Sequence, residues 1–578
     1  MESQAKNFEI TEAYQAGSGM PVLTDERRLL LKELFAFPGR DILNRIMNLD
    51  DPREMVLGLT CEDFFWVIKK VGEEDSPVLL ELASVDQWQY LLDLEIWERD
   101  RLDISHASRW MTLLQQADCR KLVRWLFSEG EYLAYYHFFR TLEVVVINDK
   151  DEVFDIPDGF FSLDGVFYIR VLDPQYRESM EDIIRVMVDE DLTRYQALLL
   201  GLAGVLPAEA EEEMYRLRNV RLAEHGFLPY EEAIEVYSPL DPGVLEKEER
   251  QDFNEIIHDS EIRAIIPLLP LSQTGTQNVF MDVVGRTGDS IFLERLRLEF
   301  AGLANQILSA DGIVAHEIET LVEACKKGAR VINLAIEKAC GNDLLSAEKL
   351  LRCHSLVTLF RVGFGMALKL KWEAEHWLKG SWFYRLGLDP DFWGEHWGGI
   401  LKGLLEKRPR LYVGPGQKEE YKDFEWLSDL GECLKALRGL MVLDGLLEKL
   451  VESHPLKEEI IHSPELTFHP ILFNLWARLL LKIEPSFSGI SLEKAKTFLY
   501  KLRGQSRKPP YKMEKFRRTF ITDFMAHASD ADPETASMLE KTLSLIWEEF
   551  REEYELVSIS DFDGRYSKFV TIINDLNS

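Results

Sequence analysis

Apolar residues in this chain recur mainly at steps of three and four positions, the period of an amphipathic α-helix. The clearest example is residues 316–340. One apolar stripe runs along this segment, and it consists of Ile318, Leu321, Val322, Cys325, Ala329, Ile332, Ile336 and Ala339. Gly341 follows directly, and glycine readily adopts the left-handed conformation that ends many helices. The pattern predicts a helix over 316–340 and a second long helix over 346–378, the two forming an antiparallel hairpin.

Residues 27–139 alternate short helical patterns with short polar breaks. Thr60, Ser84 and Ser105 each precede such a pattern, where a side-chain oxygen can cap free backbone N–H groups. Large aromatic residues follow these caps closely and would anchor each helix to its neighbour; they are Phe64, Phe65, Trp88 and Trp110. This spacing predicts short stacked helices of the solenoid type.

One stretch departs from the helical pattern. Residues 142–147 (LEVVVI) and 165–171 (GVFYIRV) are rich in β-branched and aromatic residues, and turn-forming residues lie between them. We therefore predict a small hairpin or sheet within residues 142–171. The expected fold class is mainly α and multi-domain, with this one small β element.

Polar and proline-rich stretches divide the predicted helices into regions. Residues 1–24 are predicted to be a flexible tail, and residues 25–206 an N-terminal helical domain that contains the β element. Residues 207–278 hold several prolines and end in LPLSQTGTQN, so we predict a linking region with short helices. Residues 279–578 are predicted to form a C-terminal helical domain.

The charge of the chain restricts its partners. The 578 residues include 100 Asp and Glu against 67 Lys and Arg, a net charge of −33. A surface this acidic repels phosphates and anionic lipids, so nucleic acid is not expected as a partner. The apolar runs are too short or too interrupted for membrane insertion. The six cysteines form no CxxC pair and no apolar signal region begins the chain, so a cytoplasmic location is expected.

Familiar catalytic motifs are absent from the sequence. It contains no GxxxxGK[ST] phosphate loop, no GxGxxG after a strand, no GxSxG and no HExxH. We therefore expect no cofactor and leave open whether the chain is an enzyme. The preferred interpretation is a protein–protein interaction scaffold or adaptor of the bacterial cytoplasm, because stacked helices present extended binding surfaces without dedicated chemistry.

The most unusual local feature is residues 372–397, which hold five of the thirteen tryptophans. We predict that Trp377, Trp393 and Trp397 form an exposed anchor for a partner protein, since large amphipathic rings often dominate interfaces. The alternative is an enzyme, or a small-ligand or metal-binding protein, with a pocket in this region. Its polar groups, and its only candidate metal ligands, would be Glu373, His376, Glu395 and His396. A third possibility is an aromatic core without a binding role.

Residues 501–518 reverse the charge of the chain, with eight Lys and Arg against one Glu, or 8 − 1 = +7. Arg507, Lys508, Arg517 and Arg518 are predicted to bind an acidic surface. That surface could belong to another protein or, in self-association, to a second copy of this chain. A solvated basic loop is the simpler alternative.

Two segments carry a resemblance to a known family. ELASVDQWQYLLDLEIWERDRLD (residues 81–103) and RLAEHGFLPYEEAIEVY (residues 221–237) resemble an uncharacterised bacterial family, a domain of unknown function. This resemblance bears on the fold class and the cellular compartment of the chain, but it implies no activity. The short-helix array at residues 55–140 is also similar in style to the cytosolic helical domain of MgtE-type magnesium transporters, without a specific motif that would carry over transport or magnesium binding.

Overall fold

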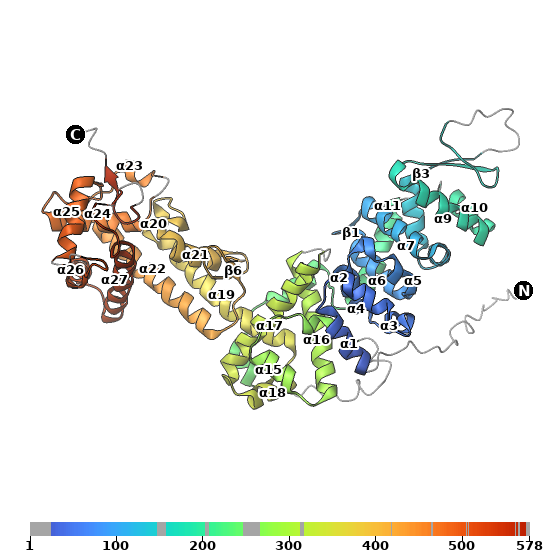
Figure 1. Ribbon diagram of the computed structural model, residues 1–578, viewed down its shortest axis with the longest axis horizontal. Helices are drawn as coiled ribbons and strands as arrows, with labels where there is room; N and C mark the ends of the chain where they lie inside the picture. The colour runs from blue at the N-terminus through green and yellow to red at the C-terminus, as the bar shows by residue number, and fades with distance from the viewer. Residues whose placement is uncertain are drawn as a thin grey trace, which may run out of the picture. The chain divides into compact units, whose positions relative to one another are not determined.

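The computed structural model describes residues 25–146, 158–202, 207–246, 266–312, 317–417, 419–463, 466–504, 506, 508–560, 562–563 and 567–573. Contacts group the chain into two compact units, residues 1–362 and 363–578. Helices dominate both units, and the described strands form two-stranded sheets (Figure 1). The predicted mainly α fold is confirmed.

The N-terminal unit begins with a run of short helices. Its first elements are α1 (Asp25–Phe35), α2 (Gly39–Met47), α3 (Pro52–Leu57), α4 (Cys61–Val71), η1 (Glu73–Asp75), α5 (Pro77–Leu82), α6 (Val85–Glu95), β1 (Trp97–Glu98), β2 (Arg101–Leu102), α7 (Ile104–Leu126) and α8 (Glu131–Thr141). The predicted caps Thr60 and Ser84 are confirmed, since their side chains accept the N–H groups of Asp63 and Gln87. Ser105 lies inside α7 instead, because Asp103 caps this helix.

The predicted β element is also confirmed. Strands β3 (Leu142–Val146) and β4 (Phe167–Val171) pair antiparallel, and Phe161 bridges to Ile169 of β4. Alternate residues of β4 face the core: Phe167, Ile169 and Val171 are buried. Residues 147–157, between the two strands, lie outside the described part of the chain.

The remaining elements of the N-terminal unit are helical. They are η2 (Pro174–Tyr176), α9 (Arg177–Glu190), α10 (Leu192–Gly201), α11 (Pro207–Ala223), α12 (Tyr230–Ala233), η3 (Ile234–Tyr237), η4 (Pro242–Glu246), α14 (Leu269–Ser272), α15 (Val279–Arg286), α16 (Ser290–Asp311), α17 (Ile318–Cys340) and α18 (Leu344–Cys353). Helix α17 matches the predicted helix 316–340 and is followed, as expected, by Gly341 in a positive-φ conformation.

The second predicted long helix, 346–378, is wrong in one respect. The structure divides it into α18 and α19 (Leu356–Gly380), with His354 in an extended conformation between them. Two side chains stabilise the start of α19: Ser355 Oγ accepts the N–H of Thr358, and Glu299 accepts the N–H of Leu356. These bonds satisfy N–H groups that a continuous helix would have bonded itself.

Helix α19 continues past residue 362 into the C-terminal unit. The other elements of this unit are α20 (Trp382–Arg385), η5 (Pro390–Trp393), α21 (Gly394–Leu405), β5 (Leu411–Tyr412), β6 (Tyr421–Lys422), α22 (Leu427–Ser453), α23 (Glu458–Ile461), α24 (Phe468–Leu481), β7 (Ile490–Ser491), α25 (Leu492–Arg503), α26 (Glu514–Met525), η6 (Ala526–Ala528), α27 (Pro533–Tyr554) and β8 (Ile572–Ile573). In the described helices of either unit, no stretch is both long and apolar enough to cross a bilayer.

An aromatic core holds the C-terminal unit together. The ring of Phe473 stacks on those of Phe520 (5.0 Å) and Phe550 (4.5 Å), which brings α24, α26 and α27 into contact. Phe569 is 1% exposed, and its ring lies 5.1 Å from that of Phe473. Strand β8 follows and pairs in parallel with β7, so a late segment of the chain completes this core.

Candidate functional site

The tryptophan-rich segment, residues 372–397, contributes to the core of the C-terminal unit. Trp393 is fully buried. Its ring lies 5.2 Å from the ring of Phe383 and 4.9 Å from that of Phe392. Trp377 is half-buried, and its ring lies 6.3 Å from that of Trp393. These rings pack against one another, as in an ordinary aromatic core.

Trp397 is 6% exposed, and its ring packs on helix α22 at Gly439. A Cβ at that glycine would come within 3.1 Å of the Trp397 ring, so a larger residue there would press on the ring and favour its displacement. The predicted exposed anchor is therefore wrong for Trp393 and Trp397. The physical reason is that η5 and α21 pack against neighbouring helices through these rings.

The four polar residues of the alternative pocket lie at the surface around this core. His376, Glu395 and His396 are exposed and Glu373 is half-buried. Within the described residues, no three His, Cys, Asp or Glu side chains are arranged to hold a metal ion. Trp393 and Trp397 are packed on other side chains, so they do not form the ligand-facing wall that this alternative requires.

The basic segment leads to a different site. Arg507 lies outside the described residues, and Lys508 is exposed ahead of α26. Arg517 and Arg518 lie on α26 and line a groove of about 1070 Å³ between α26 and α27. Among the predicted site residues, these two neighbouring arginines line a common cavity.

The groove exists because α26 and α27 turn their aromatic residues inward. The ring of Phe520 on α26 lies 5.5 Å from the ring of Trp547 on α27, and both side chains are fully buried. The opposite faces of the two helices carry the polar residues that line the groove. Local amphipathicity thus places the basic residues at an open surface.

Cations exceed carboxylates along this groove. Four lining residues are cationic and two are acidic; these are Lys515, Arg517, Arg518 and Lys541, against Glu514 and Glu540. Arg517 is held by its own chain, since its Nη1 lies 3.1 Å from Glu514 and 3.6 Å from Glu548. Lys515, Arg518 and Lys541 form no hydrogen bond or ion pair with any described residue. Their charges remain available to an incoming group.

Two apolar side chains line the groove together with these cations. Leu545 of α27 is 58% exposed, and Ile521 of α26 is half-buried beside it in the groove. An apolar contact of this kind beside cations could seat one apolar side chain of a partner.

The α27 side of the groove was not predicted from the sequence. The basic segment ends at Arg518, whereas Lys541 and Leu545 come more than twenty positions later. One signal was present in the sequence, because Leu545 does not belong to the buried apolar face of α27. That face includes Leu539, Leu543, Ile546, Trp547 and Phe550. An apolar residue on the polar face of an amphipathic helix is the pattern that could have identified it.

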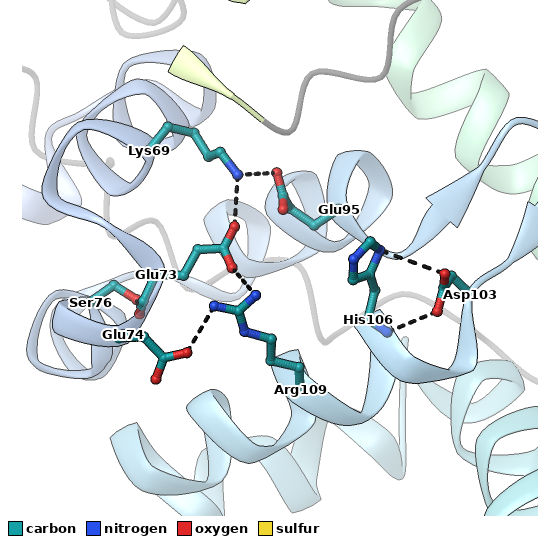
Figure 2. Close-up of polar contacts among 8 residues, drawn as sticks. All are labelled: Lys69, Glu73, Glu74, Ser76, Glu95, Asp103, His106 and Arg109. Atoms are coloured by element: carbon teal, nitrogen blue, oxygen red, sulfur yellow. Dashed lines mark hydrogen bonds and ion pairs between the residues drawn. The ribbon is translucent and has the colours of Figure 1, made fainter. Parts of the chain in front are cut away.

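A second polar cavity, of about 750 Å³, lies in the N-terminal unit among α4, α6, α7 and the start of α17. Lys69 Nζ lies 2.9 Å from Glu73 Oε1 and 3.0 Å from Glu95 Oε1 (Figure 2). The side chains of Lys69 and Glu95 are each 3% exposed. Arg109 bridges Glu73 and Glu74 at 3.0 and 2.8 Å.

Five charged side chains at this second cavity pair with one another: Lys69, Glu73, Glu74, Glu95 and Arg109. Burial would raise the pKa of Glu73, but the hydrogen bond from Lys69 and the charges of Lys69 and Arg109 outweigh it and lower this pKa. Figure 2 shows the same carboxylate reached from both sides by these cations. The network therefore joins α4, η1, α6 and α7. In the groove of the C-terminal unit, three of the four cations, Lys515, Arg518 and Lys541, form no ion pair with a described residue, so this groove is the stronger candidate for binding.

Comparison with known proteins places the chain in a family. The model of a family of unknown function, DUF6178, matches residues 23–572. No curated protein and no solved structure is significantly similar to the chain. The likeness of residues 55–140 to the helical domain of MgtE-type transporters stays a prediction, whereas the predicted membership of an uncharacterised family is confirmed. The chain belongs to the DUF6178 family, whose function is unknown.

Proposed function

We propose that this chain is a protein-binding scaffold or adaptor of the bacterial cytoplasm, and that the groove between α26 and α27 binds an acidic amphipathic helix of a partner protein. One observation carries the proposal. Lys515, Arg518 and Lys541, whose side chains have no partners among the described residues, line the same groove as the exposed Leu545 in a chain of net charge −33.

Charge explains why the groove would select an acidic partner. Carboxylates of a partner would meet unpaired cations here, while the acidic remainder of the surface would repel them. Binding would therefore be confined to the groove. The same field disfavours nucleic acid, whose phosphates repeat along its length and would meet acidic surface beyond the groove.

The dimensions favour a helix as the bound segment. Helix α26 has 12 residues and is about 18 Å long, which matches about three turns of a partner helix. Such a helix could place a leucine on Leu545 and Ile521, with glutamates one turn to either side near Arg518 and Lys541. The apolar contact would supply affinity and the ion pairs would fix orientation.

A designed peptide tests this proposal. The probe is a fluorescein-labelled helix of about 15 residues with one leucine flanked by glutamates at helical spacing, titrated with the full chain by fluorescence anisotropy. The double variant Arg518→Glu/Lys541→Glu is expected to bind about tenfold or more weakly, a loss of at least about 1.4 kcal/mol. Added salt should weaken binding to the wild-type chain.

Two controls make the result specific. The variant Lys435→Glu/Lys494→Glu makes the same charge change at exposed positions of the C-terminal unit outside the groove, and should bind as the wild type does. A peptide of the same composition with its leucine moved off the acidic face should bind weakly. The proposal fails if both double variants bind alike, or if the groove variant instead abolishes a dimer seen by sedimentation, which would identify a second copy as the occupant.

A further inference from the structure

The first turn of α4 contains two adjacent buried carboxylates, each bonded to a different later segment. Glu62 is 6% exposed and Asp63 is 1% exposed. Asp63 bonds to the start of α14, and Glu62 bonds to His225, just after α11. One helical turn therefore connects two segments that lie far from it along the chain.

Asp63 caps the start of α14. Its carboxylate accepts the N–H of Leu268 at 3.0 and 2.8 Å and the N–H of Leu269 at 2.8 Å. These groups lie at the N-terminus of α14, where backbone N–H groups lack helical partners. The bonds hold residues 268–269 directly on α4.

Glu62 and His225 form the second connection. Glu62 Oε1 lies 2.9 Å from Nδ1 of His225, while Glu62 Oε2 is buried without a hydrogen-bond partner among the described residues. The ring of Tyr90 lies 4.7 Å from the imidazole, and Asn305 donates to the carbonyl of His225 at 2.8 Å. His225 is therefore held by three contacts: Glu62 of α4 and Tyr90 of α6 contact its imidazole, and Asn305 of α16 bonds to its backbone carbonyl.

We propose that Glu62, Asp63 and His225 form a pH-sensitive clasp, which holds residues 268–269 and the end of α11 on α4 below neutral pH and loosens as the pH rises through neutrality. The geometry supplies the mechanism. Glu62 and Asp63 are adjacent in the chain and both buried, and Glu62 is bonded to the imidazole of His225. Loss of protons from Asp63 and His225 leaves two carboxylates without a balancing positive charge, away from water.

The proton affinities of the two groups fit this mechanism. Burial raises the pKa of Asp63 to about 7, and the charge of Glu62 adds to the rise, although the N–H bonds of Leu269 and Leu268 oppose it. Burial would lower the pKa of His225, but its bond to Glu62 outweighs burial and raises this pKa above 6.5. As the pH rises, Asp63 and His225 therefore each lose a proton, and the charge of the cluster becomes more negative by two.

The other ionisable groups around the clasp do not supply a compensating proton. Burial raises the pKa of Cys61 to about 12 and that of Tyr90 well above 10, so both stay neutral throughout. Asp93 is bound by Arg221, whose two nitrogens lie 2.7 Å from its two oxygens. Glu224 adds negative charge near His225 and so acts in the same direction as Glu62.

The direction of the pH effect follows from linkage. In the unfolded chain Asp63 loses its proton near pH 4, whereas in the folded chain it keeps the proton up to about pH 7. The contribution of Asp63 to the stability of the folded clasp is therefore full at low pH and is lost as the pH rises through 7. His225 acts in the same sense, because its folded-state pKa is also raised. For Asp63 alone, protection of the clasped segment should fall about tenfold between pH 6 and pH 8.

Hydrogen exchange of the full chain measures this directly. Exchange is followed by mass spectrometry at pH 6 and pH 8, with times scaled for the intrinsic effect of pH, in peptides that contain Leu268 and Leu269. The wild-type protection factor should fall about tenfold or more. The neutral isostere Asp63→Asn should show little fall, and His225→Gln should show an intermediate one.

Asp444→Asn is the matched control. Asp444 also accepts two backbone N–H groups at a helix start, those of Trp382 and Phe383, but it lies in the C-terminal unit. This variant should leave the pH response at residues 268–269 unchanged. An equal wild-type protection factor at the two pH values would overturn the proposal, as would a wild-type response retained in Asp63→Asn. If Asp63→Asn were to unfold, the His225→Gln response alone would still decide the question.

Discussion

Replacement of Lys69 by methionine is expected to destabilise the N-terminal unit by about 3–5 kcal/mol. The side chain of Lys69 is 3% exposed, and its Nζ lies 2.9 Å from Glu73 and 3.0 Å from Glu95. The Glu95 side chain is also 3% exposed, so its charge cannot turn to water when the lysine is lost. Breaking one side of a buried ion pair costs more than the pair contributes, because the remaining charge stays desolvated.

Urea unfolding, monitored by circular dichroism, measures the change in the free energy of unfolding, provided that the two units unfold in separate transitions. Lys70→Met is the control, because Lys70 forms no ion pair with a described residue, and it should shift stability by less than about 0.5 kcal/mol. The double variant Lys69→Met/Glu95→Leu should recover much of the loss, since it removes both buried charges together. A double variant as unstable as the single one would show that the pair is not the source of the effect.

Trp393→Ala is expected to destabilise the C-terminal unit by about 3–5 kcal/mol. The Trp393 side chain is fully buried, and its ring contacts those of Phe383, Phe392 and Phe468 at 5.2, 4.9 and 5.8 Å. Its removal leaves a cavity that these rings can only partly fill, and lost packing adds to the lost transfer free energy. Thermal unfolding by calorimetry would measure the loss.

Trp372→Ala provides the comparison. Because Trp372 is 49% exposed, its replacement should lower the free energy of unfolding by less than about 1 kcal/mol. The contrast separates a core from a binding surface. If Trp393→Ala left stability unchanged while weakening a partner complex, the packing described for this segment would be incorrect. The exposed-anchor hypothesis would then regain its basis.

The fold was largely predictable because its local signals agree with its packing. Five members of the predicted stripe are buried in α17: Leu321, Cys325, Ala329, Ile332 and Ile336. Residues 142–146, rich in β-branched side chains, pair with residues 167–171 as predicted. The break between α18 and α19 was not predictable. It depends on Glu299, a residue far away along the chain, which accepts the N–H of Leu356.

The candidate site was predictable only in part, for a related reason. Arg517 and Arg518 stood out as charge reversals in an acidic sequence, and the structure places both on the groove. The tryptophan cluster stood out equally, yet composition does not say whether a large ring faces solvent or a neighbouring helix. That outcome depends on residues such as Gly439, whose lack of a side chain admits the Trp397 ring. The clasp at Glu62 and Asp63 gave no sequence signal, because its partners lie more than 150 positions later.

The late closure of the C-terminal core has a consequence for folding during protein synthesis. Phe569 and strand β8 complete a core built largely from α24, α26 and α27. The ribosome tunnel holds back the newest part of a chain, so this core cannot close until residues 567–573 have emerged. Until then, the rings of Phe473 and Phe550 lack one of their aromatic neighbours. A nascent chain stalled before residue 567 should therefore present this unfinished aromatic surface to chaperones, and one released beyond residue 573 should not.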